Sequence, residues 1–274
     1  MTSAWADDLA FAIDVGARAG AVLMDRYERL EAIHHKSAKD VVTEADTLSE
    51  RLILDAIRAH SAGDGMLAEE SGSHATGAGA DPTAKHGRVW VIDPLDGTVN
   101  YANGIPFFCV SVGLVVDGCP VVGIVHDPTR GETYAASIDG PALLVDRANP
   151  GGRVVVASEK EKLSDYVISL ALGGRAVATR VRTVRKAIRI SRSMGAAALA
   201  LAYVANGRFD AFVQSSGMSA WDIAAGGLIA QRAGAIVTDM TGGPWFDIGQ
   251  RSGSVGLIAA PAAHHAELRA MVGG

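Results

Sequence analysis

The chain has 274 residues with a formal net charge of −5, and 49% of its residues are hydrophobic. A chain of this length can bury a large core, as one domain or two, without disulfide bonds or structural metals. The acidic balance gives no nucleic-acid signature, charges among the first thirty residues exclude a secretory signal, and the longest apolar run, Met194 to Ala205, is too short for a membrane span. We therefore expect a cytoplasmic protein with no nucleic-acid or membrane partner.

Two helices are predicted at the start of the chain. Apolar residues recur every three or four positions from about residue 3 to 29, as in an amphipathic helix. A second helix is expected from Thr43 to His60, with Thr43 as N-cap and Asp46 placed where the helix dipole favours an acid. The intervening segment, His34 to Asp40, is predicted to be a turn.

The middle of the chain predicts an antiparallel sheet. Before it, the segment from Ser71 to Pro82 has little bulk and no periodicity, which predicts a mobile surface loop. Cys109 and Cys119 lack disulfide or metal spacing and are predicted to be buried core thiols. Short runs rich in β-forming residues, joined by turn dipeptides, are expected to form hairpins at 88–92, 107–116, 120–127 and 132–137.

Beyond residue 150 the pattern alternates between strands and helices, which is typical of α/β architecture. Two prolines and an Asn-Pro step between Pro141 and Pro150 suggest a boundary, so we divide the chain into an α+β half (1–145) and an α/β half (146–274). The expected elements are strand 153–157, helix 160–172, strand 187–191, helix 195–206, strand 209–213, helix 222–233, and strands near 236 and 256.

The most informative motif follows the apolar strand that begins near Trp90. Asp93 and Asp96 come three residues apart and are followed by Gly97 and Thr98. Carboxylate oxygens are the ligands that Mg²⁺ prefers, and a turn rich in free N–H groups suits a phosphate. Asp-Pro and Asp-Gly are also common turn dipeptides, which would explain the motif equally well in isolation.

Further acids occur where a shared metal site would need them. Glu69 and Glu70 end a short apolar segment, and Asp222 follows Trp221 at the start of a predicted helix, although a helix N-cap would also explain Asp222. Together, these motifs resemble the inositol monophosphatase family of Mg²⁺-dependent, lithium-sensitive phosphatases. The resemblance covers nearly the whole chain and is carried by Lys36–Thr43, Asp46, Glu69–Ser71, Asp93–Thr98, Gly195–Ala197, Trp221–Asp222, Ala224–Gly226 and Thr241–Pro244.

The resemblance implies a layered αβαβα sandwich of the inositol monophosphatase and fructose-1,6-bisphosphatase type, a homodimer, and a small phosphorylated metabolite as substrate. It also implies two or three Mg²⁺ ions. Glu69, Asp93 and the Leu95 carbonyl would hold one, Asp93, Asp96 and Asp222 a second, and Glu69 would contribute to a weaker third.

Catalytic roles follow from the same resemblance. Glu69 and Thr98 would orient the attacking water, with the Thr98 hydroxyl accepting or relaying its proton. Asp46 resembles the family's outer acid near the third ion and Lys36 its nearby cation, although an acid in a first helical turn and a lysine in a loop are ordinary features. Gly97 and Thr98 are expected to open a helix whose N–H groups face the phosphate.

The substrate contacts are expected around the family's substrate loop. The segment Ser193–Ala198 matches that loop, with Gly195, Ala196 and Ala197 as its expected contacts, and Asp96, Gly97, Thr98 and Asp222 complete the expected substrate-binding set. Ser215 stands where inositol-binding members usually carry a glutamate, seven residues before Asp222, which could weaken inositol recognition. A basic stripe, defined as Arg175, Arg180, Arg182, Arg185, Lys186, Arg189 and Arg192, is a solvated face, a subunit contact or a site for a second phosphate.

The predicted function is Mg²⁺-dependent hydrolysis of a small phosphate monoester, first of all inositol monophosphate, by a metal-activated water. Val99-Asn100-Tyr101 resembles the inositol-phosphatase branch, but histidinol phosphate, fructose 1,6-bisphosphate, NADP and adenosine 3′,5′-bisphosphate stay open. A non-enzymatic role as a binding partner in a transcription complex is the alternative of another class. The three-residue Asp spacing disfavours a phosphoaspartate enzyme, and no P-loop or His-Glu-x-x-His motif is present.

Overall fold

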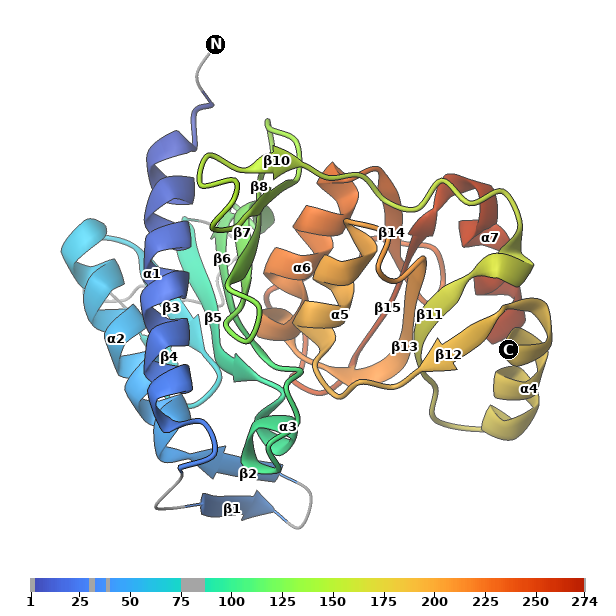
Figure 1. Ribbon diagram of the computed structural model, residues 1–274, viewed down its shortest axis with the longest axis horizontal. Helices are drawn as coiled ribbons and strands as arrows, with labels where there is room; N and C mark the ends of the chain where they lie inside the picture. The colour runs from blue at the N-terminus through green and yellow to red at the C-terminus, as the bar shows by residue number, and fades with distance from the viewer. Residues whose placement is uncertain (1–2, 30–32, 38–39, 75–86, 274) are drawn as a thin grey trace.

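Two β-sheets alternate with three layers of helices (Figure 1). The computed structural model describes residues 3–29, 33–37, 40–74 and 87–273, of which 33–37 and 40–42 are described by their backbone alone. Helices α1 and α2 cover the outer face of the first sheet, α5 and α6 lie between the sheets, and α4 and α7 cover the outer face of the second. The predicted αβαβα sandwich is therefore confirmed.

The first sheet has eight strands in the order β10-β9-β8-β7-β6-β5-β3-β4. All neighbouring strands are antiparallel except β3 and β5, which run parallel. The hairpins predicted between residues 88 and 137 form its centre. The strands are β3 (Gly65–Ala68), β4 (Gly72–His74), β5 (Arg88–Asp96), β6 (Cys109–Val116), β7 (Cys119–Asp127), β8 (Glu132–Ser137), β9 (Leu143–Val145) and β10 (Arg153–Val154).

Helices α1 (Ala6–Arg26) and α2 (Glu44–His60) pack their apolar faces on this sheet. The start of α2 is as predicted. The Thr43 hydroxyl accepts from the Ala45 N–H, and the Asp46 carboxylate accepts from the Thr43 N–H, which forms a capping box. Asp46 is thereby buried and held in one orientation.

The second sheet has five strands in the order β12-β11-β13-β15-β14. Strands β12, β11 and β13 are parallel, and β15 runs antiparallel to both β13 and β14. This parallel core matches the alternating pattern expected after residue 150. The strands are β11 (Val167–Ala171), β12 (Ile190–Arg192), β13 (Ala211–Met218), β14 (Ala235–Asp239) and β15 (Val255–Pro261).

The remaining helices fill the inner layer and the far side of the second sheet. Small and aliphatic side chains of α5 and α6 form the core between the sheets. None of the helices in the described parts of the chain combines the length and the hydrophobicity of a membrane span. These helices are α3 (Thr98–Ala102), α4 (Val177–Ala187), α5 (Ala197–Val204), α6 (Ala220–Arg232) and α7 (Ala262–Val272).

Several local predictions are wrong. The helix expected at 160–172 is a short 3₁₀ turn, Leu163–Asp165, followed by β11. Its apolar run is buried on a central strand, and such a run cannot be told from a buried helix by periodicity. The turn expected from His34 to Asp40 contains β1 (Ile33–Ser37), which pairs with β2 (Asp40–Thr43).

A helix was also missed between the predicted helix 160–172 and the predicted strand 187–191. Helix α4 carries valines at helical spacing, Val177, Val181 and Val184, of which only Val184 is buried. The strand expected at 187–191 begins later, at β12. Cys109 is buried as expected, but Cys119 is exposed at the start of β7.

Two expectations keep the status of predictions. Of the loop expected from Ser71 to Pro82, Gly72–His74 forms β4 and the part from residue 75 on lies outside the described residues. The division at 145/146 falls just before β10, which still pairs with β9 of the first sheet.

Candidate active site

A bulge in β5 turns Asp93 and Asp96 toward the same side of the first sheet. Asp93 pairs with Ser111 of β6 and Asp96 with Cys109, so three residue steps on β5 match two on β6. In a regular strand, residues three apart point to opposite faces. The extra residue at the bulge therefore brings both carboxylates to the face covered by α5 and α6.

Packing on either side of the bulge confirms this orientation. Val89 and Val91 of β5 pack with Ala220 and Ala224 of α6, so Asp93, two residues further along, faces the same helix. The Leu95 side chain turns the other way, into the core beneath α1 and α2. The Asp93 carboxylate accepts from the Leu95 N–H at 3.0 Å, which stabilises the bulge.

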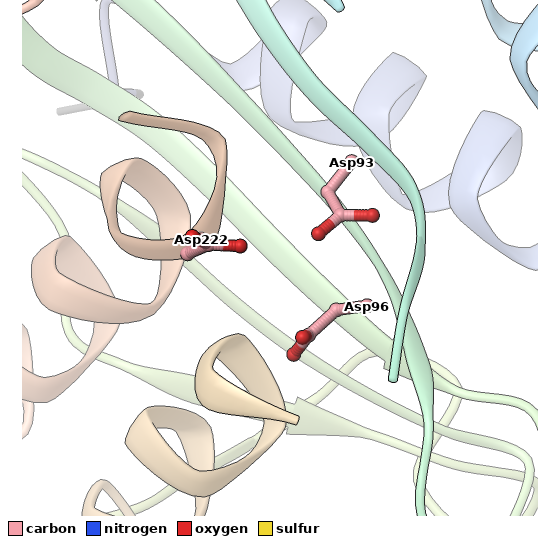
Figure 2. A group of neighbouring side chains, drawn as sticks. All are labelled: Asp93, Asp96 and Asp222. Carbon is pink, nitrogen blue, oxygen red and sulfur yellow. The ribbon is translucent and has the colours of Figure 1, made fainter. Parts of the chain in front are cut away.

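Asp222 comes from the first turn of α6, three residues after the N-cap Ser219. Its carboxylate accepts from the Ser219 N–H at 2.6 Å in a capping box. Asp222 is therefore not the N-cap residue of α6, as one explanation from the sequence had it. The N-cap is Ser219, and Asp222 occupies the third position of the helix. Here a carboxylate is fixed by the helix end and points toward the bulge of β5 (Figure 2).

The three carboxylates form one cluster. Oxygens of Asp93, Asp96 and Asp222 lie within 4.8 Å of one another (Figure 2). Among the residues that the structure describes, no lysine, arginine or histidine forms an ion pair with any of them. The first two are buried, with 1% and 7% of their surface exposed, and Asp222 is partly buried.

The electrostatics of this cluster favour a bound cation. Burial, followed by the charges of Glu69, Asp96 and Asp222, raises the pKa of Asp93 well above its usual range. Burial raises the pKa of Asp96 to about 6, and burial with the charge of Asp96 raises that of Asp222 to about 7. An all-oxygen donor set that is destabilised as free carboxylates suits a hard divalent cation.

Asp96 is held by the N-terminus of α5. Its carboxylate accepts from the N–H groups of Ala197 at 3.1 Å and Ala198 at 2.7 Å, with a longer contact to Leu199 at 3.4 Å. These bonds lower the pKa of Asp96 and oppose the effect of burial. The backbone N–H of Ala197, a residue of the predicted substrate loop, therefore orients Asp96, a predicted metal ligand.

Glu69 lies beside Asp93 at the end of β3. Its N–H donates to the Ile92 carbonyl at 3.1 Å, which continues the pairing of β3 with β5, and its carboxylate contacts the Asp93 side chain. The next residue, Glu70, donates its N–H to the buried Glu50 carboxylate of α2 at 2.9 Å. Because the Glu69 carboxylate contacts the Asp93 side chain, these two predicted metal ligands are neighbours in the structure.

Thr98, Asp46 and the Leu95 carbonyl form a second polar group at the start of α3. The Thr98 hydroxyl lies 3.1 Å from the Asp46 carboxylate and 3.0 Å from the Leu95 carbonyl, and can donate to either. Burial raises the pKa of Asp46, while hydrogen bonds from Thr43 and Thr98 partly oppose the shift. Lys36 lies on β1, and its predicted role stays a prediction because only its backbone is described.

A cleft of about 310 Å³ opens beside the cluster. Asp96 and Asp222 line one end. The remaining lining residues are uncharged and come from β11, the loop before α5, the first residue of α5, and β13: Ser169, Ala171, Ser193, Met194, Gly195, Ala196, Ala197, Phe212, Gln214, Gly217 and Met218.

The cleft contains most, but not all, of the expected substrate contacts. Gly195, Ala196 and Ala197 line it, whereas Ser215 does not. The Ser215 hydroxyl accepts from the Gly173 N–H at 2.8 Å, and the cleft is lined instead by Gln214, its neighbour on β13. The expected role of Ser215 in substrate binding stays a prediction.

The basic stripe does not line the cleft either. Helix α4 packs through Val184 against Ile168 and Leu170, while Ser169 and Ala171 of the same strand face the cleft. Because side chains alternate along a strand, α4 and its cations lie on the opposite face of the second sheet. Arg189 of the stripe pairs with Asp165 at 2.8 Å.

Sequence reasoning missed part of the cleft. Ser169 and Ala171 were missed because a helix, not a strand, was predicted at 160–172. Gln214 was missed because its neighbour Ser215 was chosen as the substrate contact. Asn100 was noted only as a mark of a family branch, yet it bonds across to the substrate loop. A contact between segments so distant in the chain cannot be predicted from a local sequence pattern.

The layered fold places an acidic cluster that suits divalent cations beside a cleft, which is the arrangement expected of a metal-dependent hydrolase. A family model described as "Inositol monophosphatase family" matches residues 5–272, and the chain belongs to this family, which is generally metal-dependent. It is a phosphatase.

Individual relatives span almost the same length. Inositol monophosphatase 2 from Solanum lycopersicum is 33% identical over 262 residues, which are 92% of each chain. Nus factor SuhB from Pseudomonas aeruginosa is 36% identical over 251 residues, 87% of each. The crystal structure of the extragenic suppressor protein suhB from Bartonella henselae superposes with a TM-score of 0.85 and 29% identity, covering 97% of this chain and 98% of that one.

Proposed function

We propose that this protein hydrolyses a small phosphate monoester in the presence of Mg²⁺, with inositol monophosphate as the first candidate substrate. The observation that supports this most strongly is the convergence of Asp93, Asp96 and Asp222 at one end of an uncharged cleft. The family membership supports the same reaction. The cleft is large enough for a monosaccharide-sized alcohol.

The donor set fits two or three Mg²⁺ ions. Glu69, Asp93 and the Leu95 carbonyl would hold one, and Asp93, Asp96 and Asp222 a second, with Glu69 contributing to a third. When bound, these ions lower the pKa of water and neutralise charge on the phosphoryl and leaving oxygens.

The chain's own residues position the water and its proton. The Thr98 hydroxyl is oriented by Asp46 and the Leu95 carbonyl, so its oxygen lone pairs can accept a hydrogen bond from an attacking water. Asp46 can then take up the hydroxyl proton, because burial gives this carboxylate a raised pKa and hence a greater proton affinity. Glu69 would orient the water from the other side.

The start of α3 would bind the phosphate. Gly97 precedes this helix with a φ of 94°, and a side chain there would meet the Ala196 side chain and the Phe107 carbonyl at 3.1 Å. Glycine therefore allows α3 to approach the substrate loop closely. The free N–H groups of the first turn then face the ester phosphate.

The uncharged lining favours a monophosphate over a bisphosphate. Ser169, Ser193 and Gln214 offer hydrogen bonds to hydroxyl groups, and none of the lining residues among the described side chains is basic. A second phosphate would be desolvated there without a countercharge. Histidinol phosphate, a monophosphate, is compatible with this lining. Fructose 1,6-bisphosphate, NADP and adenosine 3′,5′-bisphosphate would need contacts to their additional phosphates from residues outside it.

A binding role in a transcription complex is a second candidate, supported by the name Nus factor SuhB that the Pseudomonas aeruginosa relative shares with other relatives. The clustered carboxylates favour catalysis, since a binding surface does not require buried acids that repel one another. By resemblance to the family we further propose a cytoplasmic homodimer that is inhibited by Li⁺.

The proposed function is tested by phosphate release from inositol 1-phosphate, histidinol phosphate, fructose 1,6-bisphosphate, NADP and adenosine 3′,5′-bisphosphate, each with Mg²⁺, with Mg²⁺ and Li⁺, and with chelator. We expect release that requires Mg²⁺ and is fastest with a monophosphate. Absence of release from every ester at all Mg²⁺ concentrations would overturn the proposal and leave the binding role.

A further inference from the structure

A buried amide joins the phosphate end of the cleft to the substrate loop. Asn100 lies on α3, two residues after Thr98, and only 9% of its surface is exposed. Its side-chain Nδ2 donates to the Phe107 carbonyl and to the Met194 carbonyl, both at 2.7 Å. Both N–H donors of the amide are therefore used, and one of them reaches a residue that lines the cleft.

The part of the substrate loop that precedes α5, Ser193–Ala196, is called the loop below and is packed directly on this amide. Gly195 has a φ of 77°, and a Cβ atom built on it would lie 3.3 Å from Asn100 Nδ2. A side chain at this position would be strained and would push the loop away from α3. The left-handed glycine and the amide thus form one tight contact between the two segments.

Helix α3 has other anchors that do not depend on Asn100. The Tyr101 hydroxyl donates to the Leu23 carbonyl of α1 at 2.6 Å, and Thr98 is held by Asp46 and Leu95. Loss of the Asn100 donors would therefore leave the phosphate end in place.

The substrate loop is held more sparsely. Downstream of it, Asp96 binds the N–H groups that open α5. Upstream of it lies β12, which has three residues and stands at the edge of the second sheet. Between these two ends, the Met194 carbonyl bonded to Asn100 ties the loop to the other wall of the cleft.

We propose that Asn100 is a positioning residue for the substrate alcohol: it fixes Ser193–Ala196 against α3 and thereby sets the wall of the cleft that the alcohol contacts. The proposal rests on the proposed function and deepens it. It assigns recognition of the alcohol to a side chain that touches neither the metal ligands nor the substrate.

Two variants remove the donors. Asn100→Asp keeps the size of the side chain but offers no amide hydrogens, so the Met194 and Phe107 carbonyls would face a carboxylate. Asn100→Ala removes the amide without adding charge. Asn103→Asp is the matched control, because Asn103 lies one turn away on the same helix end, is exposed, and makes one local bond from Nδ2 to the Val99 carbonyl at 2.7 Å.

Steady-state kinetics with inositol 1-phosphate, or with whichever ester the wild type hydrolyses fastest, give the first measurement. We expect both Asn100 variants to raise KM by about tenfold, which corresponds to the loss of a buried hydrogen bond and its alignment. In Asn100→Ala, which adds no charge, the inhibition constant for inorganic phosphate, which occupies only the phosphate end, should not change, nor should the parameters of Asn103→Asp. An equal rise in both constants, or unchanged KM in folded Asn100 variants, would overturn the proposal.

Hydrogen exchange measures the same contact without turnover. In Asn100→Ala, amide exchange should increase in peptides that cover residues 193–197, while peptides that cover α3 keep wild-type protection and Asn103→Asp matches the wild type throughout. If α3 and the loop lost protection together, Asn100 would be a general structural residue and the proposal would be wrong. An inactive wild type would refute the proposed function in the ester panel, whereas this exchange pattern decides the positioning role independently.

Discussion

The two ends of the cleft are held in different ways. At the acidic end, Asp93, Asp96 and Asp222 are each fixed by backbone N–H groups. At the other end the lining is uncharged, and the loop Ser193–Ala196 is tied to the opposite wall by one amide, Asn100. The proposed reaction centre is thus held by the ends of helices and by a strand bulge, whereas the wall proposed to contact the substrate alcohol is held by fewer contacts. The following experiments test this contrast, from the largest expected effect to the smallest.

Replacing Asp93 with Asn should reduce Mg²⁺-dependent phosphate release to background. The cluster loses a charge at its centre, while an amide oxygen can still accept from the Leu95 N–H and preserve the bulge. Release is measured across a Mg²⁺ titration, with circular dichroism to verify folding. Asp165→Asn, an acid paired with Arg189 far from the cluster, serves as control. Near wild-type release by folded Asp93→Asn would mean that the cluster is not the reaction centre.

Removing the Thr98 hydroxyl should slow turnover without weakening metal binding. A lost general acid–base contact costs about a hundredfold in kcat, so Thr98→Ala should fall by at least that factor, while Thr98→Ser retains most activity. Metal binding is followed by calorimetry with Mg²⁺. If Thr98→Ala bound the metal poorly and Thr98→Ser were no more active, the hydroxyl would have a structural role at the acidic end.

The Asp222 carboxylate should make the metal-free protein less stable as the pH rises. Asp222 has a pKa of about 7 in the folded protein against 3.8 as its ordinary value, so the folded state binds more protons between these values. This contribution is fully present below pH 4 and is lost as the pH rises through 7. Because Asp222 is partly exposed and shares its charge with Asp96, we expect about 2 kcal/mol.

Urea denaturation of chelator-treated protein at several pH values measures this effect. Asp222→Asn should flatten the pH dependence and be more stable than the wild type at pH 8, since the amide still accepts from Ser219. Adding Mg²⁺ should stabilise the wild type more than the variant. If the pH dependence of Asp222→Asn matched that of the wild type, the assigned repulsion within the cluster would be contradicted, because other buried groups such as His126 titrate equally in both proteins.

Shortening Gln214 should affect only the alcohol end. Gln214 lines the cleft while its neighbour Ser215 does not, so Gln214→Ala should raise KM for inositol 1-phosphate about threefold with kcat unchanged. Ser215→Ala, the control from the same strand, should change neither constant. A larger effect at Ser215 than at Gln214 would show that the strand presents the other face to the substrate.

The features that sequence predicts best are local ones. The capping box of Thr43 and Asp46 needs only four residues, and the helix that opens at Thr98 needs only the glycine before it. The layered fold and the set of acids were predicted from the resemblance to a family. Each motif alone is common, but the order in which the motifs occur along the chain is informative.

The features that escaped prediction depend on partners distant in the chain. The β5 bulge is defined by its register with β6, and whether Gln214 or Ser215 faces the cleft depends on the sheet that β13 joins. The segment at 160–172 carries an apolar run that is compatible with either a helix or a buried strand. It forms a strand because it pairs with β12 and β13 in the second sheet. The Asn100 bond spans 94 residues and leaves no local pattern.

Phosphate release from inositol 1-phosphate as a function of Mg²⁺ concentration, compared between the wild type and Asp93→Asn, tests the central claim most directly. We predict saturable, Mg²⁺-dependent release by the wild type that is lost in chelator and is absent from the folded variant. Equal release by both proteins, or release by the wild type that persists in chelator, would contradict a metal-dependent phosphatase centred on Asp93, Asp96 and Asp222.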